Sequence, residues 1–135
     1  MAILRVAISV NAVAGAGGAW AYMTNLSTGM AGETPRPSTA GALYSLALRN
    51  LLSEFVEGGN VLIVEYDPQL WADAEREGDF GSFEMYAQLR ELVGTGQLRL
   101  VAGNPSSPSA EMRRAREHVQ HRIHALTRRA TQESR

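Results

Sequence analysis

Few acidic side chains in this chain are placed where they could bind a metal ion, and the best candidates lie in two segments. Glu65 and Asp67 close an apolar run that begins at Asn60, and Glu111 and Glu117 lie in a basic segment near the C-terminus. Carboxylate oxygens hold divalent cations, and a two-metal site uses several of them to stabilise the attacking and leaving oxygens of a hydrolysis. Residues 1–32 contain no Asp or Glu. A carboxylate-rich metal site would therefore receive nothing from the N-terminal part of the chain.

Three histidines, His118, His121 and His124, recur at every third position of the same basic segment. Two imidazoles on one helix usually bind a metal from positions i and i+4, so this spacing spreads the rings over a wide arc. We interpret them as part of a solvated helix face, and we predict no metal and no other cofactor.

Six arginines share that segment, and they either contact phosphates or form a solvated face that complements the helix dipole. The sequence leaves both interpretations open. The six are Arg113, Arg114, Arg116, Arg122, Arg128 and Arg129.

Three other patterns indicate less chemistry. The glycine-rich segment Gly15–Gly18 lacks the Gly-Lys-Ser/Thr ending of a phosphate loop and precedes an expected strand, so we predict a hairpin turn. The chain has no cysteine, and no serine stands in a nucleophile-elbow context, which argues against thiol and Ser-His-Asp catalysis. The acidic segment Glu75–Glu84 carries Phe80 and Phe83, which suit a protein contact if they are not packed in the core.

Hydrophobic periodicity predicts five strands and four helices. The first three strands are joined by short turns, which predicts an antiparallel meander, and the last two follow helices, which predicts parallel pairing. We therefore expect an α/β fold, with a mixed sheet of three antiparallel and two parallel strands flanked by helices. The expected strands are Leu4–Val10, Gly18–Thr24, Thr28–Glu33, Asn60–Tyr66 and Gln97–Ala102, and the helices run from Ser38 or Thr39 to Gly58, from Asp67 to Arg76, from Ser82 to Val93, and from about Ser109 to about Thr131.

Two apolar faces complete this expectation. Trp20 and Tyr22 should share one face of the second strand, because side chains alternate along a strand. The last helix carries a continuous apolar stripe that should pack on the sheet. Its members are Met112, Ala115, Val119, Ile123, Leu126 and Ala130.

Composition bounds the class of protein. With 135 residues and 44% apolar side chains, the chain should form one domain over residues 1–132, followed by a short tail over 133–135. A net charge of −1 gives no general attraction to nucleic acid or to an anionic membrane. The apolar N-terminus breaks into glycines too early to span a membrane, so we predict a cytoplasmic protein. All 13 basic residues are Arg, and a small, cysteine-free chain of this kind suits a phage or mobile-element accessory protein.

The element order and four local segments together resemble the ribonuclease H family. VNAVAGAGGAW resembles the family's first strand, glycine-rich turn and aromatic second strand, written TDG…GPGGW. TAGALYSLALRNLL resembles the TNNRMEL segment that opens the first helix, and EYDPQLW resembles the TDSQYV segment after the fourth strand. VAGNPSSPSAEMRRA resembles the VKGH…P.NERAD segment that leads into the last helix. The resemblance covers nearly the whole chain and implies a ribonuclease H-like fold.

Three of the four metal-binding carboxylates of that family are missing under this alignment. The four positions hold Asn11, Tyr44, Asp67 and Arg114, and the family's loop histidine becomes Asn104. Four carboxylates would supply a charge of about −4 to two cations, whereas Asp67 and Arg114 together sum to about zero. Arg114 is expected to lie near Asp67 and to fill the metal position.

The resemblance therefore implies a non-catalytic domain that acts by binding, with a protein favoured as partner over nucleic acid. The arginines of the last helix, with Arg113, Arg116, Arg122, Arg128 and Arg129 as the expected contacts, form the predicted binding surface. Two alternatives remain open. One is an inactive domain that binds nucleic acid through this helix, and the other is a nuclease rebuilt around Glu65, Asp67 and an acid of the last helix. The oligomeric state is not indicated by the sequence.

Overall fold

Five strands form one mixed sheet in the computed structural model, which describes residues 3–14, 16–36, 38–55, 59–77 and 83–133. The strands are β1 (Ile3–Val13), β2 (Gly17–Thr24), β3 (Gly29–Thr34), β4 (Val61–Tyr66) and β5 (Leu98–Ala102). Their order across the sheet is β3-β2-β1-β4-β5. The pairs β1–β2 and β2–β3 are antiparallel, while β1–β4 and β4–β5 are parallel. The predicted sheet is therefore confirmed.

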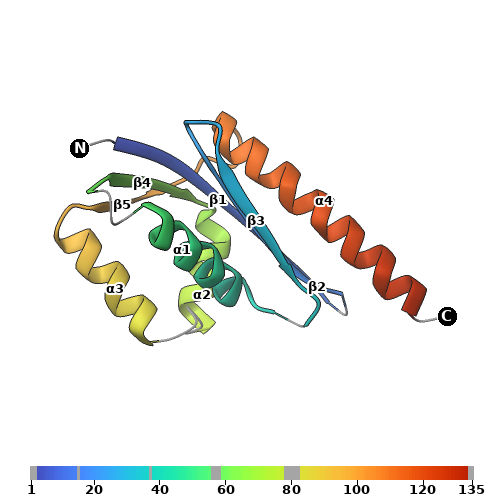
Figure 1. Ribbon diagram of the computed structural model, residues 1–135. Coiled ribbons are helices and arrows are strands. Elements are labelled where there is room, and N and C mark those ends of the chain that lie inside the picture. The colour runs from blue at the N-terminus through green and yellow to red at the C-terminus, as the bar shows by residue number, and fades with distance from the viewer. Residues whose placement is uncertain (1–2, 15, 37, 56–58, 78–82, 134–135) are drawn as a thin grey trace.

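Helices cover the sheet unequally on its two faces (Figure 1). They are α1 (Ala40–Phe55), α2 (Pro68–Glu77), α3 (Phe83–Gly94) and α4 (Ala110–Glu133). The first three lie on one face, where α1 packs on β1 and β2 and α3 packs on β5. On the other face α4 packs along β1 and β2 and touches β3. Figure 1 shows β4 and β5 lying beyond the cover of α4.

Side chains at three helix N-termini satisfy backbone N–H groups that the helices themselves leave unpaired. Thr39 Oγ1 accepts a hydrogen bond from Ala42 N at 3.2 Å, which identifies Thr39 as the N-cap of α1. Asp67 Oδ1 caps α2, and Ser109 Oγ caps α4 by accepting from Met112 N at 3.1 Å. These caps explain why the predicted helix starts are correct to within a residue or two.

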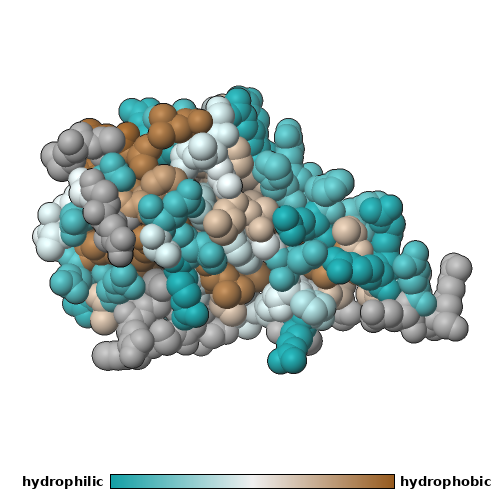
Figure 2. All heavy atoms as spheres, viewed as in Figure 1, coloured by the Kyte–Doolittle hydropathy of each residue, from teal (hydrophilic) through white to brown (hydrophobic). Residues whose placement is uncertain are grey.

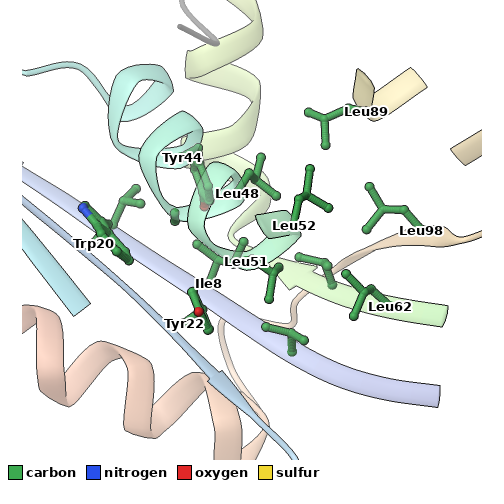
Figure 3. Close-up of a cluster of buried hydrophobic side chains, with 14 of the residues drawn as sticks. Ile8, Trp20, Tyr22, Tyr44, Leu48, Leu51, Leu52, Leu62, Leu89 and Leu98 are labelled. Atoms are coloured by element: carbon green, nitrogen blue, oxygen red, sulfur yellow. The ribbon is translucent and has the colours of Figure 1, made fainter. Parts of the chain in front are cut away.

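The larger core cluster lies between the sheet and helices α1 to α3. Figure 3 shows Leu51 of α1 close to Ile8 of the sheet, and Leu52 directed toward Leu89 of α3. Leu48 and Leu62 belong to the same cluster. As predicted, Trp20 and Tyr22 share this face, with their rings stacked at a centroid distance of 6.4 Å.

The smaller cluster holds α4 against the sheet. Ala19 and Ala21 of β2 are fully buried beneath Ala115 and Val119 of α4. Small side chains on both elements let the helix approach the strands closely. The predicted stripe is confirmed, with Met112 and Leu126 buried as well and Ile123 partly buried at its margin.

Several predictions concern the chain ends and the region between α2 and α3. Helix α4 continues through Glu133, so the first residue of the predicted tail is helical. Phe80 belongs to residues 78–82, which lie outside the described residues, and the side chain of Phe83 is not described either. Among the helices that are described, none is both long enough and apolar enough to cross a membrane.

Candidate functional site at the end of strand β4

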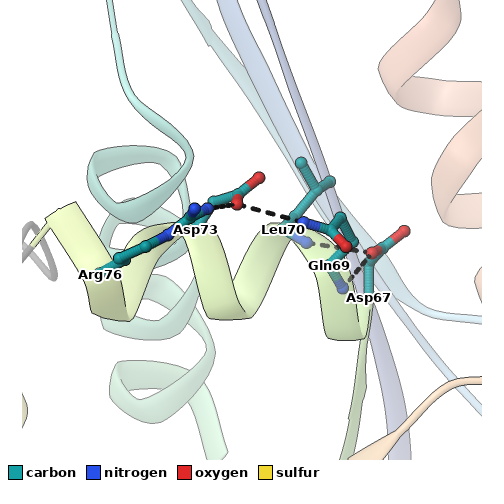
Figure 4. A network of polar contacts seen from close by, with 5 residues as sticks. All are labelled: Asp67, Gln69, Leu70, Asp73 and Arg76. Carbon is teal, nitrogen blue, oxygen red and sulfur yellow. Dashed lines mark hydrogen bonds and ion pairs between the residues drawn. The ribbon is translucent and has the colours of Figure 1, made fainter.

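Asp67 directly follows β4, and both of its carboxylate oxygens have partners. Oδ1 accepts hydrogen bonds from Gln69 N at 2.9 Å and Leu70 N at 3.1 Å, which caps α2 (Figure 4). Oδ2 lies 4.0 Å from Nη2 of Arg116 on α4. The only acid of the four expected positions is thus engaged by the fold itself.

Tyr44 fills the space on the α1 side of Asp67. Its side chain is fully buried, its ring meets Trp71 edge-on at a centroid distance of 5.1 Å, and its hydroxyl oxygen accepts a hydrogen bond from Asp67 N at 3.2 Å. Burial raises the pKa of the Tyr44 phenol well above its usual range, with the Asp67 carboxylate adding to this and its backbone N–H and Arg116 opposing it. The phenol therefore stays neutral, and it contributes no anionic oxygen to the site.

Arg116, rather than Arg114, stands next to Asp67, which corrects the expected position on the last helix. Nη1 of Arg114 instead donates a hydrogen bond to Ser27 Oγ at 3.3 Å, in the turn between β2 and β3. The physical reason is the rotation of α4, in which Met112, Ala115 and Val119 face the sheet. Arg116 follows Met112 by four residues and so flanks this buried stripe, a signal already present in the apolar spacing.

The side chain of β1 that comes level with Asp67 is Ser9. Ala7 pairs with Glu65 in the parallel ladder, and continuing that register by two residues brings Ser9 opposite Asp67. Ser9 is buried, whereas Asn11 is exposed near the end of β1 and pairs with Ala19. Neither residue is an acid, so the absence of a β1 carboxylate does not depend on the register.

The residues at this place do not match the needs of a pair of divalent cations. Ser9, Tyr44, Asp67 and Arg116 supply one carboxylate and one guanidinium, so the local charge is close to zero. Across the described ranges, no group of three His, Asp or Glu side chains is arranged to hold a metal ion. Asn104, at the expected loop position, is exposed and accepts from Ser106 N at 3.0 Å within its own turn.

The acids of the rebuilt-site hypothesis lie in different surroundings. Glu65 and Glu111 line a cavity of about 350 Å³ together with Arg5 and Arg99, and Asp67 is not part of its lining. Glu117 is exposed on α4. The fold therefore brings Glu65 and Glu111 into one cavity with two arginines, whose charges offset theirs.

The arginines of α4 divide into paired and unpaired groups. Glu33 of β3 pairs with Arg129, whose Nη2 lies 2.8 Å from Oε2, and with Arg122, whose Nη1 lies 3.9 Å from Oε1. Arg113 and Arg128 are exposed and form no ion pair within the part of the chain that the structure describes. His118, His121 and His124 are also exposed, as expected for a solvated helix face.

A charge-reversal experiment separates these two groups of arginines. Changing Arg122 and Arg129 to Glu should lower the free energy of unfolding by about 1 kcal/mol, because two partly exposed ion pairs with Glu33 become repulsions. The matched variant, Arg113→Glu with Arg128→Glu, should leave it within about 0.5 kcal/mol of the parent. Urea denaturation monitored by circular dichroism measures both. Equal stability of the two variants would mean that the Glu33 pairs contribute nothing.

Comparison with known proteins supports one structural class. No protein-family model matches the chain, and no curated protein matches it in sequence. Among solved structures, the N-terminal RNase H domain of Rv2228c from Mycobacterium tuberculosis superposes with a TM-score of 0.66 at 12% identity, covering 96% of this chain and 99% of that one. The chain therefore has the ribonuclease H-like fold.

The same fold relates it to LC11-RNase H1, which was isolated from compost by a metagenomic approach. That structure superposes with a TM-score of 0.62 at 14% identity, covering 94% of this chain and 99% of that one. A second structure of LC11-RNase H1, in complex with an RNA/DNA hybrid, gives a TM-score of 0.58 at 13% identity and covers 87% and 94% of the two chains. Identities this low define the fold alone.

Proposed function

We propose that this chain is a non-catalytic ribonuclease H-like domain that acts by binding, with a protein as its partner. The observation that carries the proposal is the Arg116 guanidinium beside Asp67, with the neutral Tyr44 phenol on the other side. A guanidinium cannot ligate a cation, and it repels one from the only carboxylate at this place.

The second support is that Asp67 has a structural task. Its Oδ1 caps α2 through two backbone N–H groups, so retaining this acid requires no catalytic role. Ser9 and Tyr44 offer neutral oxygens only, and such a set lacks the negative charge that two hard cations need.

The partner is assigned as a protein because three of the six arginines of α4 already lie beside a carboxylate. Glu33 pairs with Arg122 and Arg129, and Asp67 lies beside Arg116. With fewer unpaired arginines, α4 can make fewer contacts to phosphates and attracts nucleic acid less strongly. Exposed aliphatic side chains, such as Leu26 at 62% and Val93 at 46%, are better suited to a protein surface.

Activity on an RNA–DNA hybrid tests the loss of catalysis. The protein should not cleave the hybrid with Mg²⁺ or Mn²⁺, and calorimetry should detect no Mg²⁺ binding at millimolar concentration. The matched variant is Asp67→Asn, since Asn caps a helix about as well as Asp and should preserve the fold. Metal-dependent turnover that is present in the parent and absent from Asp67→Asn would refute the proposal and favour a rebuilt site.

A second candidate, binding of nucleic acid through α4, is favoured by the exposed and unpaired Arg113 and Arg128 in the described structure. It predicts hybrid binding that falls steeply as salt rises and that is lost when both arginines are changed to Glu. Binding that is absent, or insensitive to salt and to this variant, would leave the protein partner as the remaining interpretation.

A further inference from the structure

One part of the sheet is left without a covering helix on the α4 side. It consists of the start of β1 together with β4 and β5, and we call it the β4–β5 shelf. Register places its side chains on one face: Arg5 pairs with Ile63, which pairs with Arg99, and Glu65 in the next row pairs with Val101. A cavity of about 350 Å³ lies on this face, beside Ser109 and Glu111 at the start of α4.

Aliphatic side chains on the shelf remain in contact with solvent. Ile3 is 62% exposed, Val101 is 37% exposed and Ile63 is half-buried, whereas Leu62 and Val64 on the opposite face of β4 are fully buried. Figure 2 shows hydrophobic surface at the end of the molecule where β1 begins. Exposed aliphatic side chains of this kind gain free energy when another surface covers them.

The charges on the shelf are balanced and unpaired. Within the described residues, Arg5, Arg99, Glu65 and Glu111 form no ion pair with one another or with any other residue. Glu65 is held close to the chain at Gly103, where a Cβ atom would lie 2.9 Å from its Oε2. Two cations and two anions side by side disfavour a polyanion such as nucleic acid, and they also disfavour a partner of uniform charge. They match a surface that carries the same four charges.

We propose that a second copy of this chain docks on the β4–β5 shelf. With the two-fold axis parallel to the strands and β4 of one protomer over β5 of the other, Arg99 stands over the partner subunit's Ile63. The partner subunit's Glu65 lies one row farther along the same strand, about 7 Å away, where the Arg99 side chain reaches it diagonally. Sheets that pack face to face lie about 10 Å apart, a gap that Arg and Glu side chains together can span. The symmetry forms this contact twice. The dimer goes beyond the proposed function and holds whether or not the chain is catalytic.

Charge exchange provides the test. Sedimentation velocity at protein concentrations up to about 100 µM should show the parent as a dimer. Arg99→Glu alone and Glu65→Arg alone should each be monomeric, since each places like charges in contact across the interface. An equimolar mixture of the two variants should restore a dimer, and native mass spectrometry should identify it as the heterodimer.

The mixture also guards against misfolding, because two unfolded chains would not form a specific heterodimer. The matched control is Arg128→Glu, an exposed arginine near the C-terminal end of α4 and far from the shelf (Figure 1), which should remain dimeric. A parent that is monomeric throughout this range, single variants that dimerise like the parent, or a mixture that stays monomeric would each overturn the proposal.

Discussion

Replacing Gly17 with Ala is expected to destabilise the protein by at least about 3 kcal/mol, enough to unfold a domain of marginal stability. Gly17 opens β2 with a φ of +123°, a conformation that residues with a Cβ atom rarely adopt. An added Cβ would lie 2.0 Å from Thr34 O and 3.0 Å from Pro35 Cα. Both contacts are with backbone, so no side-chain rotation relieves them, and the end of β3 would have to move.

Gly96→Ala is the matched control. Gly96 also has a positive φ, of +80°, but an added Cβ would meet nothing within 4 Å. Its substitution should cost only the backbone strain, about 1 kcal/mol. Urea denaturation of both variants measures the difference. Equal losses in the free energy of unfolding would show that the close approach of β2 to β3 at Gly17 does not add to the cost of the substitution.

Truncation of Tyr44 should have the second large effect. Tyr44→Ala removes a fully buried ring that packs against Trp71 and should cost about 3–5 kcal/mol. Tyr44→Phe keeps the ring and removes only the acceptor of the Asp67 N–H, so it should cost about 1–3 kcal/mol. The free energy of unfolding from chemical denaturation measures both.

Tyr22→Phe is the control for the hydroxyl effect. The Tyr22 hydroxyl donates to Glu54, an exposed carboxylate that water can solvate when the phenol is removed. Its loss should therefore cost less than that of the Tyr44 hydroxyl. If Tyr22→Phe lowers the free energy of unfolding more than Tyr44→Phe does, the hydrogen bond between Tyr44 and Asp67 is not the more important of the two for stability.

Most of the fold was predictable because local signals agree with one another along the chain. The apolar run after Asn60 became β4, and its buried members match a strand covered on one face and partly open on the other. Thr39 and Pro68 mark helix starts in both sequence and structure, since capping and proline preferences act within a few residues. The ribonuclease H-like fold followed from the order of these elements.

The site was harder to predict because it depends on how elements are rotated against one another. Successive residues of a helix differ by about 100° in direction, so moving from Arg114 to Arg116 turns the side chain to a different surface. Ser9 and Asn11 lie on the same face of β1, two residues apart along the strand. Only the pairing of β1 with β4 decides which of the two lies opposite Asp67. The ion pairs of Glu33 with Arg122 and Arg129 join residues far apart in sequence, so no local sequence pattern predicts them.

The position of α4 also sets an order of assembly. This helix packs on β1 and β2, from which it is separated by roughly 90 intervening residues, and such distant contacts slow folding because a long loop must close first. During synthesis the hairpin of β1 and β2 emerges early. Its apolar side chains Ala19, Ala21 and Met23 stay exposed to solvent until the last helix has been made and covers them. Nascent chains that end before α4 would therefore present this apolar strip to chaperones or to one another.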